Sequence, residues 1–365
     1  MTPVWGSADI ITGMPIKIWS GFIEQHITAD VAYGAWQYYT ATGDQDFMDR
    51  CGYELILDTA KFWASRLEPG EDGLLHINDV VGPDEYKEHV DDNAFTNYMA
   101  AWNIRKAMAY AGELKEKNPA LYDRLNQKLN LTEAEAQWAE KLPLLYLPQP
   151  RPDGVIPQDR TYLTLKDIDL TKYKSQGKVG GIYRDFNQEQ ICHMQVSKQA
   201  DILILFLLLE NQFDASVKRA NWNYYEPRTL HDSSLSLSTH CILASDMGDR
   251  ELAYELFQRA AAIDAGPNMG SSDAGIHAAS IAGIWQSAVF GFGGLRMLEG
   301  KLRVDPSLPA SWRSLTFYFY WQGQKLRADV SRDRLRLTNL TGERPVVLTV
   351  HGKEYTVETE LEAAL

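Results

Sequence analysis

Apolar and aromatic residues recur at three- and four-residue spacing from about residue 25 to residue 291, which is typical of amphipathic helices. The pattern predicts a helix over 27–39, a polar break at 42–44 and a second helix that ends near 66. Thr132 and Glu135 have capping-box spacing and predict a helix over 132–141. Further helices are expected over 94–111, 196–210, 233–245, 251–263 and 275–290. Since no fixed-period repeat is visible, we expect an array of unlike helical hairpins.

The pattern changes after Gly294 to short β-rich runs separated by Gly, Asn and Arg-Asp breaks. Strands are expected over 315–320, 325–330, 334–338, 346–350 and 355–358. We therefore predict a helical domain over 1–294 and a small antiparallel β domain over 295–365. The connection 148–195 has little periodicity and exceeds the usual loop length, so we expect it to be functional or to cover the domain surface.

The composition of the chain indicates its cellular compartment and disfavours several classes of binding partner. The chain has 36 Lys and Arg against 49 Asp and Glu, a net charge of −13, which disfavours nucleic acid and anionic membranes as partners. The longest apolar run, 202–209, is far shorter than the ~20 residues of a membrane-spanning helix, and the N-terminus has no signal-peptide pattern. We expect a soluble, cytoplasmic protein.

Cofactor and metal signatures are not apparent in the sequence. Cys51, Cys192 and Cys241 are widely separated and match neither a disulfide framework nor a metal motif. The eight histidines have no metal-ligand spacing, and no Rossmann or P-loop fingerprint is present. We therefore expect no metal and no cofactor.

The segment 81–86 (VGPDEY) is the most informative candidate for chemistry. Gly82 and Pro83 do not fit a helix interior, so Asp84 and Glu85 are predicted on a rigid loop between two helices. Adjacent acids oppose each other's ionisation, which favours a protonated carboxyl that can serve as a general acid. The alternative is a solvated loop in which Asp84 caps a backbone group.

Two serine-rich segments are candidates for an anion site. In 226–236 (EPRTLHDSSLS), Asp232 is predicted to cap a helix whose first turn holds Ser233 and Ser234. In 271–280 (SSDAGIHAAS), a similar helix start precedes His277. Lys198 and Gln199, at the start of another helix, offer a cation suited to phosphate and an amide suited to hydroxyls. For either serine segment alone, ordinary capping and tight helix packing are the simpler explanation.

The tryptophans offer rings on which a sugar can stack, although most are more simply explained as core residues on helical faces. Those considered are Trp5, Trp36, Trp63, Trp102, Trp222, Trp285 and Trp321.

Four long motifs resemble the glycoside hydrolase family 65 disaccharide phosphorylases, which include maltose, trehalose, kojibiose and nigerose phosphorylases. The motifs are GPDEYKEHVDDNAFTNYMAAWN (82–103), KQAD (198–201), YEPRTLHDSSLS (225–236) and GIHAASIAGIWQSAVFGFGGLR (275–296). The resemblance implies an (α/α)6 toroid followed by the β domain. It also implies inverting phosphorolysis of an α-glucosyl disaccharide to β-glucose 1-phosphate and a sugar, with inorganic phosphate as co-substrate.

The resemblance assigns roles to residues of this chain. Glu85 would be the general acid that protonates the glycosidic oxygen. Phosphate would be held by Lys198, Ser233, Ser234 and His277, and the sugar would contact Lys198, Gln199 and Trp63.

The sequence also departs from the family. Members are about twice as long and begin with a β-sandwich and the first toroid helices, so we expect a C-terminal part with an incomplete toroid and impaired activity. Gly6 lies where the family's Pro-Trp-Glu-Ser-Ala segment has its acid. Two alternatives remain open: an inverting hydrolase with Glu226 activating water, and a non-catalytic partner subunit. The oligomeric state is open between a homodimer and assembly with a complementary N-terminal chain.

Overall fold

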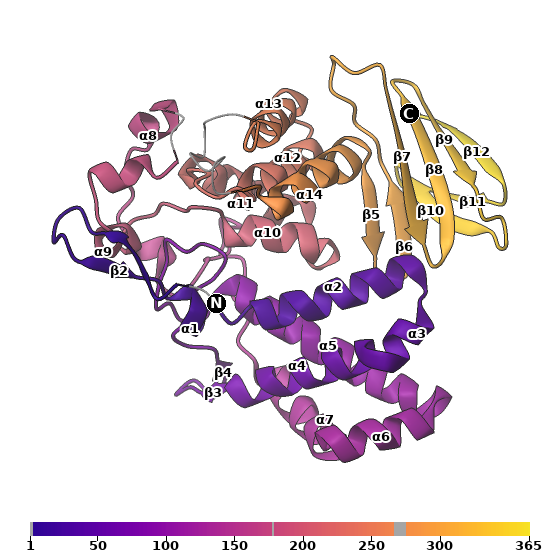
Figure 1. The fold of residues 1–365 in the computed structure, drawn as a ribbon, viewed down its shortest axis with the longest axis horizontal. Coiled ribbons are helices and arrows are strands. Elements are labelled where there is room, and N and C mark those ends of the chain that lie inside the picture. The colour runs from indigo at the N-terminus through magenta and orange to yellow at the C-terminus, as the bar shows by residue number, and fades with distance from the viewer. Residues whose placement is uncertain (1–2, 177–178, 266–274) are drawn as a thin grey trace. The chain divides into compact units, whose positions relative to one another are not determined.

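The structure, a computed structural model, describes residues 3–176, 179–265 and 275–365 (Figure 1). The chain forms two compact units. The first unit contains the residues up to 39 together with 44–169 and 182–205, and the second contains 40–43, 170–181 and 206–365. Every helix within the described ranges is too short or too polar to span a bilayer.

The first unit is mainly helical. It holds all or most of β1 (Trp5–Ala8), β2 (Pro15–Lys17), α1 (Ser20–Ile23), α2 (Ile27–Thr42), α3 (Gln45–Phe47), the π-helix η1 (Met48–Gly52), α4 (Tyr53–Arg66), β3 (Glu68–Pro69), β4 (Leu75–His76), α5 (Ala94–Lys117), α6 (Pro119–Leu129), α7 (Leu131–Lys141), η2 (Leu142–Leu144), η3 (Tyr162–Thr164), η4 (Gly181–Arg184), α9 (Gln188–Cys192) and α10 (Asp201–Leu208).

Helix α5 is the centre of this unit. It packs against α4, α6 and α7, and fourteen of its residues are buried, among them every residue from Ala94 to Ile104 in its N-terminal half. Trp102 of α5 meets Tyr33 and Trp36 of α2, with ring centroids 5.1 and 5.6 Å apart. Aromatic packing between α2 and α5 therefore fixes one face of α2 in the core.

The second unit joins helices to a β domain. It holds α8 (Thr171–Gln176), η5 (Glu210–Gln212), α11 (Ala215–Tyr225), η6 (Glu226–Arg228), α12 (Ser236–Asp246), α13 (Arg250–Ala261), α14 (Ala278–Gln286), the π-helix η8 (Ser287–Phe292), β5 (Leu295–Leu298), β6 (Lys301–Val304), β7 (Ser314–Trp321), β8 (Gln324–Ser331), β9 (Arg334–Asn339), β10 (Val346–Val350), β11 (Lys353–Val357) and β12 (Glu360–Ala364).

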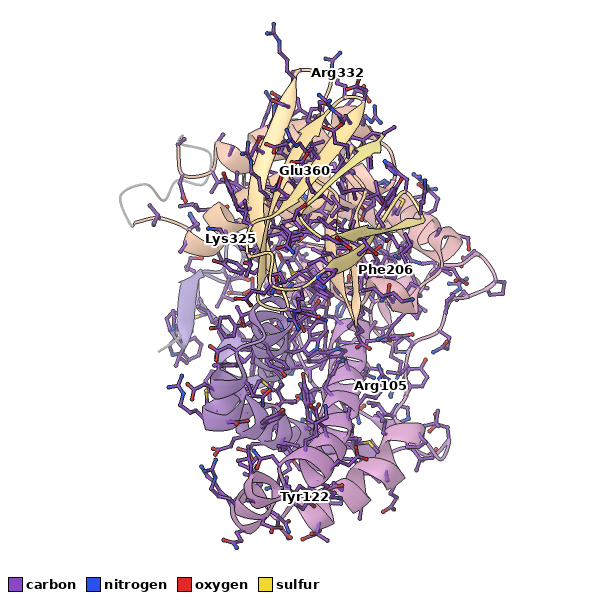
Figure 2. All side chains as sticks on the ribbon, turned by 90° about the vertical axis from the view of Figure 1, so that its right-hand side faces the viewer. Arg105, Tyr122, Phe206, Lys325, Arg332 and Glu360 are labelled. Atoms are coloured by element: carbon purple, nitrogen blue, oxygen red, sulfur yellow. The ribbon has the colours of Figure 1, made fainter. Side chains whose placement is uncertain are left out.

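The strands form two four-stranded sheets, with orders β11-β10-β6-β5 and β12-β9-β8-β7. Pairing is antiparallel except between β6 and β10, which are parallel. Strand β8 alternates buried and half-buried residues, as a strand with one face on a core does. Lys325, Arg332 and Glu360 mark the strands and turns of the β12-β9-β8-β7 sheet in Figure 2.

A buried charge cluster ties this β domain to the helices of the same unit. Arg296 of β5 donates two hydrogen bonds of 2.7 Å to the carboxylate of Asp246 at the end of α12. It donates a third, of 3.0 Å, to Glu210 of η5. Because two carboxylates accept hydrogen bonds from the guanidinium, these contacts offset the free-energy cost of burying its charge.

The predicted helices at 27–39 and 94–111 and the helix ending at 66 are confirmed as α2, α5 and α4, and all five predicted strands are present as β7 to β11. The mainly helical class with a C-terminal β domain is therefore confirmed, while closure of the helices into a toroid stays a prediction. The Thr132 capping box is wrong, because α7 begins after Asn130, whose left-handed backbone ends α6. Helix α6 and strands β5, β6 and β12 were not predicted.

Candidate active site

The loop that carries the predicted acid lies between β4 and α5 of the first unit and is held by a buried carboxylate. The Asp84 side chain is fully buried. It accepts hydrogen bonds from the backbone N–H of Lys198, at 2.8 Å, and from the side-chain amide of Gln158, also at 2.8 Å. Asp84 thus joins three segments far apart in the sequence, and its role in the structure is to fix the loop.

A second buried carboxylate completes this network. Asp201, the first residue of α10, accepts the backbone N–H of Asp84 at 2.7 Å and the side-chain amide of Asn93 at 2.6 Å. Burial raises the pKa of Asp84, and burial together with the nearby Asp84 raises the pKa of Asp201 well above its usual range. The raised pKa of Asp84 thus comes from burial and not from the adjacent Glu85.

Gly82 lies against this network so closely that the absence of a side chain is required. A Cβ atom there would be 2.3 Å from Asp201 Oδ2 and 2.4 Å from Asn93 Nδ2. We expect Gly82→Ala to lower the free energy of unfolding by about 1–3 kcal/mol, as overpacking of a buried site does. Gly112 lies at an exposed position of helix α5, and a Cβ added there meets open space. Gly112→Ala should therefore raise the free energy of unfolding by about 0.5–1 kcal/mol. Urea unfolding of both variants tests the difference in sign.

Glu85 is oriented differently from Asp84 and is the accessible acid of the pair. Its carboxylate forms an ion pair with the Lys198 ammonium, and it lies 3.4 Å from the Ser20 hydroxyl. The side chains of Glu85 and Lys198 are 37% and 27% exposed. The structure thus brings the predicted acid and the predicted cation together at the surface of the first unit.

Two neighbours of Glu85 were not singled out from the sequence. Lys87 is buried, and its ammonium donates to the carbonyls of Ile191, at 2.8 Å, and Met194, at 2.5 Å. Burial lowers the pKa of Lys87, and burial with the nearby Glu85 raises the pKa of Glu88 to about 7. Charged side chains are usually exposed, so nothing in the sequence indicates that Lys87 and Glu88 are withdrawn from solvent.

Gln199 and Trp63 are placed by the structure in supporting positions. The Gln199 side-chain amide donates to the Pro83 carbonyl at 2.6 Å and so buttresses the acid-bearing loop. Trp63 is 0% exposed within α4. Because a sugar platform needs an accessible ring face, the assignment of Trp63 to substrate is corrected: Trp63 is a core residue.

The first serine segment belongs to the second unit and borders a cavity of about 480 Å³. Asp232 and Ser233 line it, together with two cations that the sequence analysis did not single out, Lys174 and Arg259. Helix α12 begins at Ser236 and its N-cap position is Leu235, so the prediction that Asp232 caps this helix is wrong. Ser234 follows Ser233 in the turn that precedes the helix.

Glu226 and His231 also line this cavity, and the Glu226 carboxylate is held by two buried histidines. One carboxylate oxygen lies 3.3 Å from His231 Nε2, and the other is hydrogen-bonded to His240 Nδ1. His231 Nδ1 lies 2.9 Å from the Ser236 hydroxyl. One potential ligand atom from each of Glu226, His231 and His240 lies within 4.8 Å of the other two, an arrangement that resembles a metal-ligand set. However, each Glu226 carboxylate oxygen already contacts an imidazole nitrogen.

These contacts make the second unit sensitive to acid. Burial lowers the pKa of His231 from 6.5 to about 4, and the adjacent imidazoles lower the pKa of Glu226 despite its burial. Between pH 6.5 and 4 the unfolded chain binds a proton at this histidine that the folded chain rejects, so the free energy of unfolding should fall as pH falls through this window. Urea titrations at several pH values should show a smaller slope for His231→Gln. An unchanged slope would contradict the assignment.

His277 is held by the side chain that precedes the second serine segment. Its Nδ1 and its backbone N–H contact the two carboxylate oxygens of Asp264 at 2.7 and 2.9 Å. The predicted residues Ser271, Ser272 and Asp273 lie outside the described residues. Helix α14 begins at Ala278, directly after His277.

Comparisons with known proteins give these features a context. Residues 3–286 match the glycosyl hydrolase family 65 central catalytic domain, and residues 295–357 match the family's C-terminal domain. A kojibiose phosphorylase from Halothermothrix orenii is 44% identical over 96% of this chain and 45% of its own length. An α,α-trehalose phosphorylase from Thermoanaerobacter brockii is 35% identical over 93% of this chain and 44% of its own.

A solved structure of a human-microbiome protein, provisionally assigned as a kojibiose phosphorylase, superposes with a TM-score of 0.82 at 28% identity. It covers 93% of this chain and 46% of its own chain. This chain therefore spans about half the length of the curated relatives it matches.

Proposed function

Because the chain belongs to glycoside hydrolase family 65, we propose that it provides the acid and phosphate sites for inverting phosphorolysis of an α-glucosyl disaccharide. The products are β-glucose 1-phosphate and a sugar. The observation that carries the proposal is the Glu85–Lys198 pair, which a rigid, buried network presents at an accessible position. Relatives named as kojibiose, trehalose and nigerose phosphorylases support the reaction class.

Glu85 acts as the general acid in this reaction. Its carboxyl donates a proton to the glycosidic oxygen as the bond from that oxygen to the anomeric carbon breaks. A phosphate oxygen bonds to the same carbon from the opposite face, which converts the α configuration to β. Hydrogen phosphate loses a proton as it becomes the sugar ester, and that proton restores the acid, so the cycle balances.

Lys198 serves two partners in the proposal. In the structure without substrates its ammonium neutralises Glu85. A phosphate dianion is a stronger partner for an ammonium than a single carboxylate is. We propose that bound phosphate takes over Lys198, which releases the Glu85 carboxyl from its ion pair and leaves it to face the glycosidic oxygen.

The phosphate-binding role of Ser233, Ser234 and His277 is proposed on the family resemblance and on the chemistry of the cavity. Ser233 borders the cavity, whose charged lining residues are the cations Lys174 and Arg259 and the acids Glu226, Asp232 and Glu255; the two cations are the groups that would pair with phosphate. Phosphate is the proposed co-substrate, and the mechanism needs no cofactor. Chemistry of this kind requires positioned charges and a proton, both of which the chain's own side chains supply.

Hydrolysis with Glu226 as the base is the weaker alternative. A base that activates water needs a carboxylate oxygen free to accept a proton. Both oxygens of Glu226 accept from histidines, and its pKa is lowered, which makes it a poor base. These contacts favour phosphate over water as the nucleophile.

The proposed function is tested by measuring sugar release from kojibiose, nigerose, trehalose and maltose with and without phosphate. Because the chain matches about half of each relative, the assay uses the chain alone and the chain co-expressed with the remaining part of the H. orenii enzyme. We expect glucose 1-phosphate to form in proportion to phosphate. Equal cleavage without phosphate would indicate a hydrolase, and sugar binding without turnover in both preparations would indicate a non-catalytic subunit.

A further inference from the structure

A second cavity, of about 520 Å³, lies within the second unit where its helices meet its β domain. Residues of η5, α11, the end of α12, the start of α13, β6 and the turn between β10 and β11 border it. Its volume falls in the range of about 300–1,000 Å³ that is usual for small-molecule sites. No residue that borders it has a role in the proposed phosphorolysis, so the cavity calls for an explanation of its own.

The carboxylates that border this cavity already have cationic partners. Both oxygens of Asp246 accept hydrogen bonds from the buried Arg296. One oxygen of Glu210 accepts from Arg296 at 3.0 Å, and the other accepts from Arg303 at 2.6 Å. Asp305 Oδ2 lies 3.2 Å from Arg303 Nε. These three acids are therefore occupied by the cations packed against them.

Two arginines bring positive charge to the cavity without a carboxylate partner. Arg219 of α11 donates to the Met247 carbonyl at 2.7 Å, and Arg250 of α13 donates to the Ser307 hydroxyl at 2.9 Å. Both acceptors are neutral, and neither arginine forms an ion pair within the part of the chain that the structure describes. The chain has a net charge of −13 and so offers many carboxylates for pairing. Two unpaired guanidinium groups at one cavity thus form a local excess of positive charge.

Lys218 and Ser245 add buried donors to the same cavity. The Lys218 side chain is 15% exposed, and its ammonium lies 3.8 Å from Glu210 Oε1, which is beyond hydrogen-bond distance. Ser245 is 7% exposed, and its hydroxyl hydrogen-bonds to none of the described residues. Because buried polar groups in folded proteins nearly always have partners, these donors indicate a ligand that accepts hydrogen bonds.

We propose that this cavity binds a phosphate dianion, either free phosphate or the phosphate group of a small ester such as a sugar phosphate. The charge of the anion, about −1.5 to −2 at pH 7, matches the two unpaired arginines, Arg219 and Arg250. A guanidinium binds phosphate oxygens through paired hydrogen bonds, and the Lys218 ammonium adds a point charge.

This site is separate from the proposed catalytic one. Lys198 belongs to the first unit, and the cavity that Ser233 borders shares no lining residue with the cavity of Arg219 and Arg250. The proposal therefore does not depend on the proposed function. It gives the second unit an anion site in addition to the one assigned to the reaction.

Isothermal titration calorimetry with glucose 6-phosphate tests the proposal on the full chain. Arg219→Gln and Arg250→Gln should each weaken binding about tenfold, since each removes hydrogen bonds to a charged group. The matched control is Arg332→Gln, because Arg332 is also an exposed arginine of the second unit that donates to a backbone carbonyl, that of Ala310. A second control is Arg259→Gln, which removes a cation from the cavity of Ser233. Both controls should keep the affinity of the unmodified chain.

Circular dichroism of the four variants should match the unmodified chain, because all four positions are exposed. Titration with inorganic phosphate separates the two sources of the anion. An affinity equal to that for glucose 6-phosphate assigns the free anion, and a lower affinity assigns the ester.

Three results would overturn the proposal: no binding of either probe, equal weakening by Arg250→Gln and Arg332→Gln, or weakening by Arg259→Gln alone. Binding is read without turnover, so these outcomes are independent of the phosphorolysis assay.

Discussion

Glu85→Gln should lower the rate of phosphorolysis by about 10²–10⁴-fold, the usual contribution of a general acid. Glutamine keeps the length and shape of the side chain but has no proton of suitable acidity to give to the leaving oxygen. It also removes the ion pair with Lys198 while leaving the buried Asp84 network intact. Initial rates of glucose 1-phosphate formation, measured on the active preparation, give the comparison.

Two measurements separate lost acid catalysis from a damaged site. An α-glucosyl fluoride has a leaving group that needs no proton, so its phosphorolysis should survive in Glu85→Gln. Glu88→Gln provides a matched control, because it removes the nearby carboxyl whose pKa is raised to about 7, and we expect it to change the rate less than tenfold. A Glu85→Gln variant that keeps a tenth of the activity on a disaccharide would exclude Glu85 as the acid.

Local patterns were enough to predict the longer helices and the five strands β7 to β11. Apolar spacing located α2 and α5, and alternating runs located β7 and β8, because each signal lies within a few consecutive residues. Helix α6 was missed although Pro119 stands at its first position after the capping Asn118. A proline directly after a capping residue is a helix start signal that lies within the sequence itself.

Helix ends were less predictable, because side chains that suit a cap have other partners. Asp232 has a residue type that favours an N-cap, yet it lines a cavity while α12 begins four residues later. Thr132 meets the Asn126 side chain with its backbone N–H instead of closing a capping box. Propensity identifies candidates for a cap, and tertiary contacts select among them.

The candidate site shows the same division between local and distant information. The Gly82-Pro83 pair was sufficient to predict an acid-bearing loop. The residues that hold this loop, Gln158 and Asp201, are 74 and 117 positions from Asp84, and no pattern within one sequence pairs positions so far apart. Residues 148–195 were expected to be functional or superficial, and Gln158 shows that this connection also enters the core.

Asp84→Ala should be the most destabilising of the site substitutions, lowering the free energy of unfolding by about 3 kcal/mol. The change removes the acceptor for the Gln158 amide and for the Lys198 backbone N–H, and each buried donor left without a partner costs about 1–3 kcal/mol. Relief of the buried carboxylate, whose pKa is raised, offsets part of this cost. Urea denaturation at neutral pH measures the change.

The control is Asp46→Ala, which removes an ion pair with Arg50 whose side chains are 78% and 69% exposed. Surface pairs of this kind contribute about 0–1 kcal/mol, so this variant should unfold almost as the unmodified chain does. If both variants shift the urea midpoint equally, the Asp84 network does not hold the loop. If Asp84→Ala is destabilised as expected, the Lys198 backbone loses its anchor, and phosphorolysis should fall although neither Glu85 nor Lys198 has been altered.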